Sequence, residues 1–192
     1  MTEVLQARPE SPVRQRILEA ATRMFREQGI RAVSADRILA EAGCAKVTFY
    51  RHFPTKDDLV VAYLEAELEG ARRIVQAAGS LPEGERMGAL ARAIGDEMCA
   101  PGFRGCPFIN AAAEYADPDH PVREVVSRFR GWLAEEIADR LEAVGVAQAR
   151  DRADEIMMLR DGAMVAGYLS GDPESVTAAL RRAVGAIVDS SD

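Results

Sequence analysis

Four polar side chains follow one another at close spacing between residues 46 and 52. Lys46, Thr48, Tyr50 and His52 all carry N–H or O–H groups, and no acidic residue lies among them. Such groups donate hydrogen bonds to phosphate oxygens and to the edges of bases. A set of donors without a carboxylate suits a polyanion, so the chemistry that this stretch predicts is contact with nucleic acid.

Two short helices joined by a tight turn must position these donors. Ser34 is a good N-cap for the first helix, and apolar residues at helical spacing follow it. Gly43 can take a positive φ at no steric cost, which suits a turn. A second short helix over 45–52 starts at once, and Phe49 and Phe53, four residues apart, can anchor it inward. The pattern predicts a helix-turn-helix.

The end of the second helix and the start of the next one are also marked. Pro54 stops the second helix, and Thr55 with Asp58 has the spacing of a capping box. Lys56 then lies at a helix N-terminus, where backbone N–H groups favour a phosphate. By spacing alone, an ordinary helical hairpin with a solvated face fits the stretch equally well.

The run AEAG…TFYRHFPTKDDL resembles the DNA-binding domain of the TetR (tetracycline-repressor-like) family of bacterial transcription regulators. The matching positions are Ile38, Ala42, Gly43, Thr48, Phe49, Tyr50, His52, Phe53, Lys56 and Leu59. The resemblance is sharp over about residues 14–64 and looser afterwards. It implies double-stranded operator DNA as a partner, with contacts from Arg14, Ser34, Ala45, Lys46, Thr48, Tyr50, His52 and Lys56. Lys46 and Thr48 are the candidates for reading base edges, and Tyr50, His52 and Lys56 for phosphate contacts.

Two residues depart from the family's pattern. Cys44 occupies a turn position where Val or Ile is usual, and Asp36 lies in the first turn of the first helix of the motif. A carboxylate there would repel a nearby phosphate, so Asp36 is not counted as a contact.

The charge is divided unevenly along the chain. The 192 residues carry a net charge of −7, which alone argues against a nucleic-acid binder. Residues 1–60, however, hold 10 Lys/Arg and 8 Asp/Glu, whereas residues 61–192 hold 14 and 23. A mildly basic head on an acidic body fits a DNA-binding head with a separate regulatory part.

Composition excludes several other classes of protein. Three cysteines and two histidines without ligand spacing predict no metal site and no cofactor, and they favour a reduced, cytoplasmic protein. Residues 1–15 are polar and hold two prolines, so no secretory signal is expected. The apolar runs are far shorter than about 20 residues, so no membrane span is expected.

Apolar periodicity and turn residues predict an all-α fold of about nine helices. Beyond the motif, helices are expected to begin near Ser11–Pro12 and to cover about 56–77, 85–100, 108–115, 121–144, 152–170 and 173–189. Residues 1–56 are expected to form an arm and the DNA-binding domain. Residues 57–192 are expected to form an effector-binding and dimerisation domain, which the helix from Lys56 links to the head.

The stretch FRGCPFINAAAEY resembles a GCP-x-x-NA-x-x-E element seen in a subset of TetR-like regulators. The family implies a small-molecule effector, and a largely apolar pocket with a few polar groups would suit one. The candidate lining residues are Phe103, Cys106, Phe108, Asn110, Glu114, Phe129, Trp132, Met157, Met164 and Tyr168. An aromatic and methionine stripe of this kind is equally well explained as ordinary core.

A homodimer is expected because one head reads only a few base pairs, and two-headed binders place their half-sites about 34–36 Å apart. The last two helices combine small residues with an aliphatic stripe, and in the family they form a four-helix bundle with the partner. The candidate interface residues are Ile156, Leu159, Ala163, Ala166, Ser170, Val176, Leu180, Val184 and Ile187.

We therefore expect a non-enzymatic regulator, a repressor released from a palindromic operator by its effector. The alternative is a thiol-based redox or electrophile sensor that uses Cys106 or Cys99, which lie seven residues apart across a Pro-Gly break. A DNA-binding architectural protein without an effector is also compatible with the sequence. No nucleophile–base pair or phosphate-cradling glycine loop supports an enzyme.

Overall fold

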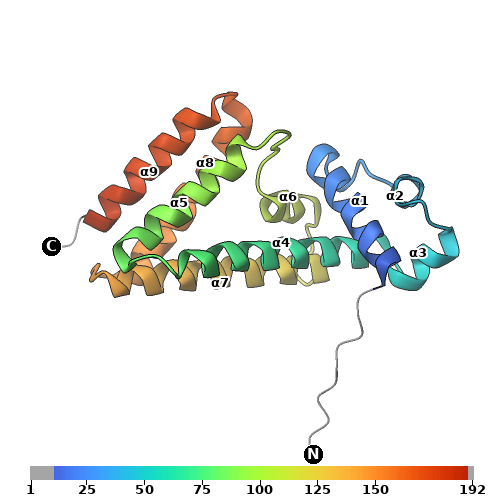
Figure 1. The fold of residues 1–192 in the computed structure, drawn as a ribbon, viewed down its shortest axis with the longest axis horizontal. Helices are drawn as coiled ribbons and strands as arrows, with labels where there is room; N and C mark the ends of the chain where they lie inside the picture. The colour runs from blue at the N-terminus through green and yellow to red at the C-terminus, as the bar shows by residue number, and fades with distance from the viewer. Residues whose placement is uncertain (1–10, 190–192) are drawn as a thin grey trace, which may run out of the picture. The chain divides into compact units, whose positions relative to one another are not determined.

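The computed structural model describes residues 11–189, which form nine helices and no strand (Figure 1). The expected arm over residues 1–10 lies outside the described residues. The helices are α1 Pro12–Gln28, α2 Ala35–Ala42, α3 Lys46–His52, α4 Lys56–Ala78, α5 Glu83–Cys99, α6 Pro107–Glu114, α7 Pro121–Ala143, α8 Ala149–Ser170 and α9 Pro173–Asp189. The prediction of an all-α fold is confirmed.

The capping signals of the motif act as the sequence predicts. The Ser34 hydroxyl accepts from the backbone N–H of Arg37 at 3.4 Å, and Gly43 ends α2 with a left-handed φ of 59°. Thr55 and Asp58 form a reciprocal box, because Asp58 N–H donates to Thr55 Oγ1 at 3.0 Å and Thr55 N–H donates to Asp58 Oδ2 at 2.9 Å. Local hydrogen bonds therefore set the ends of the two motif helices and the start of α4.

The described part of the chain divides into two compact units, one ending at Tyr63 and the other beginning at Leu64. We call them the head and the body. The division falls inside α4, and the predicted functional boundary at residue 56 stays a prediction.

In the head, α1, α2 and α3 enclose a small apolar core (blue to cyan in Figure 1). Its fully buried side chains include Ile17, Val33, Ile38, Phe49 and Leu59. Tyr63 joins this core by packing edge-on against Phe25, with ring centroids 5.4 Å apart. The core fixes α3 from one side and leaves its other side to solvent.

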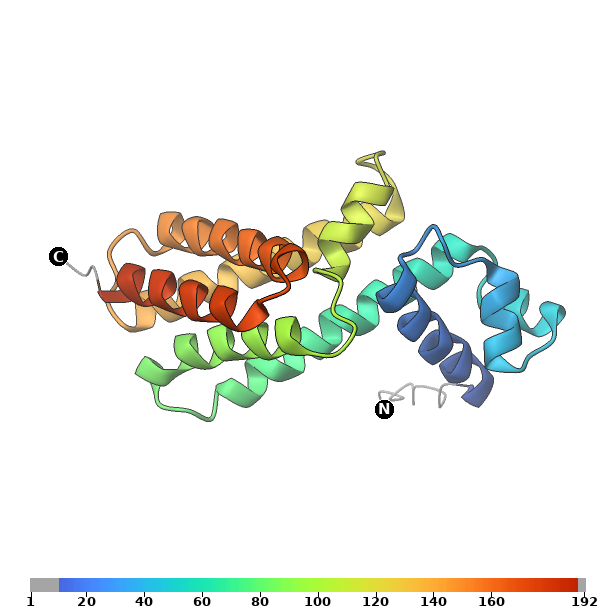
Figure 2. The same ribbon diagram turned by 90° about the horizontal axis from the view of Figure 1, so that it is seen from above.

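In the body, α8 packs between α7 and α9, and α5 packs on α9 (Figure 2). The α5–α9 contact is close because Gly95 of α5 has no side chain where Thr177 of α9 approaches. The short helix α6 packs on α7. This leaves α6, α7 and α8 around one hollow, which is described below.

Candidate nucleic-acid interface and body pocket

Helix α3 presents one apolar face to the head core and one polar face to solvent. Phe49 and Phe53 are buried, with ring centroids 6.2 Å apart, so they anchor the helix as their spacing predicts. Tyr50 packs edge-on against Phe49, with ring centroids 5.2 Å apart, and 40% of its surface stays exposed. The rotation of α3 about its axis is therefore fixed by aromatic packing.

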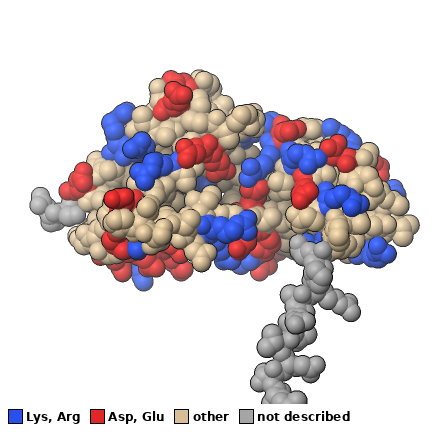
Figure 3. Space-filling view, in the orientation of Figure 1, with Lys and Arg blue, Asp and Glu red and all other residues tan. Residues whose placement is uncertain are grey.

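The exposed face of α3 carries several of the predicted contact residues. Lys46 and Tyr50 are exposed, Thr48 is half-buried, and Ala45 lies exposed at the helix start. Figure 3 shows Lys and Arg side chains interspersed with Asp and Glu over the head. The exposed face of α3 combines a cation and two hydroxyls, and α3 itself carries no carboxylate, which suits a groove of DNA.

An acid from α2 lies beside this face. Asp36 Oδ1 is 3.7 Å from Lys46 Nζ, and both side chains are well exposed, at 78% and 67%. Asp36, which the sequence indicates is unfavourable for a phosphate contact, therefore pairs with Lys46, the predicted base-reading residue.

Three other predicted contact residues are engaged within the head. Lys56 Nζ donates to the carbonyl of Ile30 at 2.6 Å, and the guanidinium of Arg14 lies 5.1 Å from the centre of the Phe53 ring. The Nε2 atom of His52 is buried without a hydrogen-bond partner in the described structure. Nε2 of His52 therefore does not face solvent.

Two exposed residues of α3 were missed by the sequence analysis. Val47 is 82% exposed, which is unusual for an apolar side chain on a helix with a core to cover. A methyl-bearing side chain at this place suits the methyl group of thymine. Arg51, one turn further on, is exposed and suits a phosphate. Placing the inward face at Phe49 and Phe53 would have revealed both residues.

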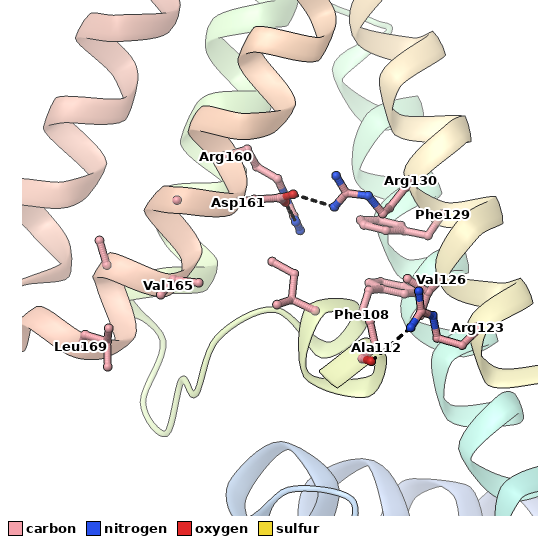
Figure 4. A pocket seen from close by; sticks show the side chains of 13 residues that line it. Phe108, Ala112, Arg123, Val126, Phe129, Arg130, Arg160, Asp161, Val165 and Leu169 are labelled. Atoms are coloured by element: carbon pink, nitrogen blue, oxygen red, sulfur yellow. Dashed lines mark hydrogen bonds and ion pairs between the residues drawn. The ribbon is translucent and has the colours of Figure 1, made fainter. Parts of the chain in front are cut away.

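The body contains a pocket of about 770 Å³ between α6, α7 and α8 (Figure 4). This volume lies in the range of small-molecule sites. Its lining residues are Phe108, Ile109, Ala112, Arg123, Val126, Phe129, Arg130, Arg160, Asp161, Gly162, Val165, Ala166 and Leu169. The Phe108 and Phe129 rings stack in parallel with centroids 3.7 Å apart.

Arg160 is the one buried charged residue of the described structure, with 4% of its surface exposed. It donates to Asp161 Oδ1 at 2.8 Å and reaches Cys106 Sγ at 3.2 Å. Burial opposes its charge, but the Cys106 sulfur and the Asp161 carboxylate outweigh burial and raise the pKa of the guanidinium above its ordinary value. Arg160 is therefore held as a cation at the pocket wall.

The ten predicted lining residues divide into several groups. Phe108 and Phe129 line the pocket, and buried Cys106 contacts it indirectly through Arg160. Met157 and Met164 are buried elsewhere in the body core. The remaining five lie outside the lining, with Asn110 and Tyr168 exposed and with Phe103, Glu114 and Trp132 half-buried.

The cysteines are all free thiols. Cys106 is 1% exposed, whereas Cys99 lies at the surface near the end of α5. No disulfide joins them in the described structure, and the redox alternative stays a prediction.

The predicted interface residues are divided between core and surface. Ile156, Ala163, Leu180 and Val184 are buried within one protomer. Leu159 and Ser170 are exposed, whereas Ala166, Val176 and Ile187 are half-buried. The apolar surface of α8 follows a different stripe, in which Met158, Val165 and Leu169 are exposed. Gly162 completes this stripe at helical spacing.

A helix-turn-helix head with an outward-facing donor set, followed by a helical body, is the architecture of a DNA-binding regulator. A family model described as "Bacterial regulatory proteins, tetR family" matches residues 17–63. A TetR-family transcriptional regulator from Streptomyces coelicolor is 44% identical to this chain, with a TM-score of 0.89 over 93% of this chain and 95% of that one. The chain therefore belongs to the TetR family; it is a helix-turn-helix, DNA-binding transcription regulator and not an enzyme.

Two further relatives are more distant. An HTH-type transcriptional regulator of Mycobacterium tuberculosis is 27% identical over 183 residues, covering 83% of this chain and 88% of that protein. The multidrug binding protein EbrR, solved in complex with malachite green, is 27% identical with a TM-score of 0.71 and covers 93% of this chain and 98% of its own. Within the described residues, no helix has the length and hydropathy to span a bilayer, and no cluster of side chains has the composition of a metal site.

Proposed function

We propose that this regulator is a repressor that binds a palindromic operator as a homodimer and is released by a small-molecule effector. The observation that carries the DNA-binding part is the acid-free outer face of α3, fixed by buried Phe49 and Phe53. Val47 and Arg51 are added to the predicted contacts, as a thymine-methyl contact and a phosphate contact. Repression would take place in the bacterial cytoplasm, where operator DNA is found.

The dimer is proposed to form through α8 and α9. Met158 and Leu159 of α8 are exposed apolar side chains outside the pocket lining, and they give a second copy a surface to bury. Buried residues such as Ile156 and Leu180 would support these helices from inside rather than touch the partner. A dimer supplies the two heads that a palindrome requires.

The effector is proposed to occupy the pocket between α6, α7 and α8. EbrR, whose printed description names malachite green as its bound compound, supports the idea that this body architecture accepts small molecules. Release follows if the effector binds more tightly to a body state that disfavours the DNA-bound arrangement of heads. Helix α4 runs from the head into the body without a break and is the proposed carrier of that change.

The test is selection from random-sequence duplex DNA with purified protein at two salt concentrations. Enrichment of a palindrome with two half-sites is expected, and Val47→Ser should relax the preference at a thymine position without changing the salt slope. Enrichment of single half-sites would contradict the dimer. Absence of any enriched sequence, with only weak salt-sensitive binding, would contradict sequence-specific regulation.

A further inference from the structure

The charged wall of the body pocket carries more positive than negative groups. Arg130 donates to Asp161 Oδ2 at 2.6 Å, and Arg160 donates to Oδ1 of the same carboxylate at 2.8 Å. Arg123 also lines the pocket, and its donors go to the carbonyls of Ala112 and Tyr115 at the end of α6. One carboxylate is thus shared by two guanidinium groups, and with Arg123 two positive charges are left without a counter-ion in the lining.

The guanidinium of Arg160 is also short of good acceptors. One terminal nitrogen donates to Asp161, the other reaches only Cys106 Sγ, and Nε is buried without a partner in the described structure. Sulfur is a weak acceptor, and a buried charged donor without a strong acceptor is costly. An oxygen anion in the pocket would relieve that cost, by direct contact or by drawing Arg130 away from the shared carboxylate.

The remaining lining is apolar, and the Val165 and Leu169 part of it lies apart from Arg130. Ile109, Val126, Val165 and Leu169 contribute aliphatic surface, and Figure 4 shows Val165 and Leu169 on a different side of the pocket from Arg130. The aromatic pair is close to the charged wall, because the guanidinium of Arg160 lies 5.4 Å from the centre of the Phe129 ring. An apolar wall around a cation lowers the local dielectric and strengthens its attraction for an anion.

We propose that the pocket binds an amphipathic organic acid, with its carboxylate at Arg130 and Arg160 and its apolar part against α6 and the Val165 and Leu169 side of α8. The inference names the chemical class of the effector and in that respect rests on the proposed function. A cationic ligand would meet like charge at the same wall, and a neutral one would leave Arg160 without an oxygen acceptor.

The test compares ligands of one skeleton and different charge on the full chain. Titration calorimetry would measure decanoate, decanamide and decyltrimethylammonium, and then 2-naphthoate and 2-naphthamide, all below their aggregation limits. Each acid is expected to bind about ten-fold more tightly than its amide, because a charge-assisted hydrogen bond is about twice as strong as a neutral one. An amide or ammonium compound that binds as tightly as its acid, or failure of both acids to bind, would overturn the assignment.

Variants separate anion recognition from general support of the pocket. Arg130→Gln should weaken decanoate binding about ten-fold and leave decanamide binding within two-fold of wild type. The matched control is Arg128→Gln, on the same helix and exposed, where the arginine pairs with Glu65 outside the pocket lining; it should change neither ligand. Arg160→Lys keeps the charge and should retain most of the acid preference. Equal loss of acid and amide in Arg130→Gln would show a purely structural role and overturn the proposal.

Operator binding measured in the same samples separates the organic-acid assignment of the pocket from the proposed release of operator by an effector. Acid binding that does not release operator would leave the pocket chemistry standing and contradict the proposed release. Release by a neutral or cationic compound, with no acid binding, would leave the release standing and overturn the acid assignment.

Discussion

Replacing Asp36 by Asn tests whether the α2 acid restrains DNA binding by α3. Asp36 Oδ1 lies 3.7 Å from Lys46 Nζ, and both side chains are well exposed. An exposed pair of this kind stabilises a fold by about 0.2–1 kcal/mol, so its loss should leave the head folded. In Asp36→Asn, Lys46 no longer gives up this ion pair when it binds DNA. A gain of about 0.2–1 kcal/mol corresponds to about 1.4- to 5-fold tighter binding per head.

The salt dependence gives a second measure of the same event. If freed Lys46 neutralises a phosphate, the slope of log affinity against log salt should steepen by about 0.9 per head. The assay is fluorescence anisotropy of a labelled operator duplex at four salt concentrations, with circular dichroism to confirm folding. A random-sequence duplex measured in parallel separates phosphate effects from base reading.

Two controls define the result that would refute this reasoning. Glu41→Gln removes another exposed acid of α2, which pairs with Arg23 at 2.7 Å, and reports the generic effect of one less negative charge. In the double variant with Lys46→Gln, Asp36→Asn should give little gain in DNA affinity, because the lysine that the single change frees is absent. Equal gains in Glu41→Gln and Asp36→Asn, or an undiminished gain in the double variant, would contradict the local competition.

Four further predictions concern folding and assembly. Phe49→Ala should cost about 3–5 kcal/mol, because the ring is fully buried in the head, and should abolish operator binding while denaturation still shows a folded body. Gly95→Ala should cost about 1–3 kcal/mol of unfolding free energy by overpacking α5 against α9, and added Thr177→Ala should restore part of it; no rescue would contradict the close contact. Met158→Asp should convert the dimer to monomer in light scattering, since a side chain that is 67% exposed and outside the pocket lining would become a charge at the proposed interface. Hydrogen bonds from Ser175 lower the pKa of Asp172, so its stabilisation is present above the unfolded value near 3.8 and is lost as pH falls through the lower folded value; the loss of melting temperature in Asp172→Ala should therefore be largest at pH 7 and should shrink as the pH is lowered below 3.8.

Much of the helix pattern was predictable because local chemistry sets it. Ser34, Gly43 and the Thr55–Asp58 box each act within a few residues, and the helix ends they predict are observed. The start of α8 was misplaced by three residues, because the helix begins after Gln148, whose φ of 54° is uncommon for a residue other than glycine. No rule of composition anticipates that turn.

The residues on the outer face of α3 were predictable once its inner face had been identified. Once Phe49 and Phe53 are placed inward, the helical repeat determines that Lys46, Val47 and Tyr50 face outward. Polar residues alone were considered for contacts, so Val47 was overlooked. The inward turn of His52 depends on packing inside the head, and its position at the end of α3 gives no sign of it.

The pocket was not predictable in the same way, because its charged wall joins residues from different helices. Arg130 belongs to α7 and Asp161 to α8, and only the packing of these two helices brings them together. Charged residues on a helix are ordinarily solvated, so the sequence offers no reason to place Arg130 or Asp161 in a pocket.

Arg160, in contrast, could have been recognised from the sequence, because it lies on the same stripe of α8 as buried Met157 and Met164, three and four residues away. A guanidinium at a core position must find partners or a ligand, and Arg160 has one carboxylate that it shares and one weak sulfur acceptor. The residue that breaks the apolar pattern of α8 is thus the one that most narrowly defines what the pocket can bind.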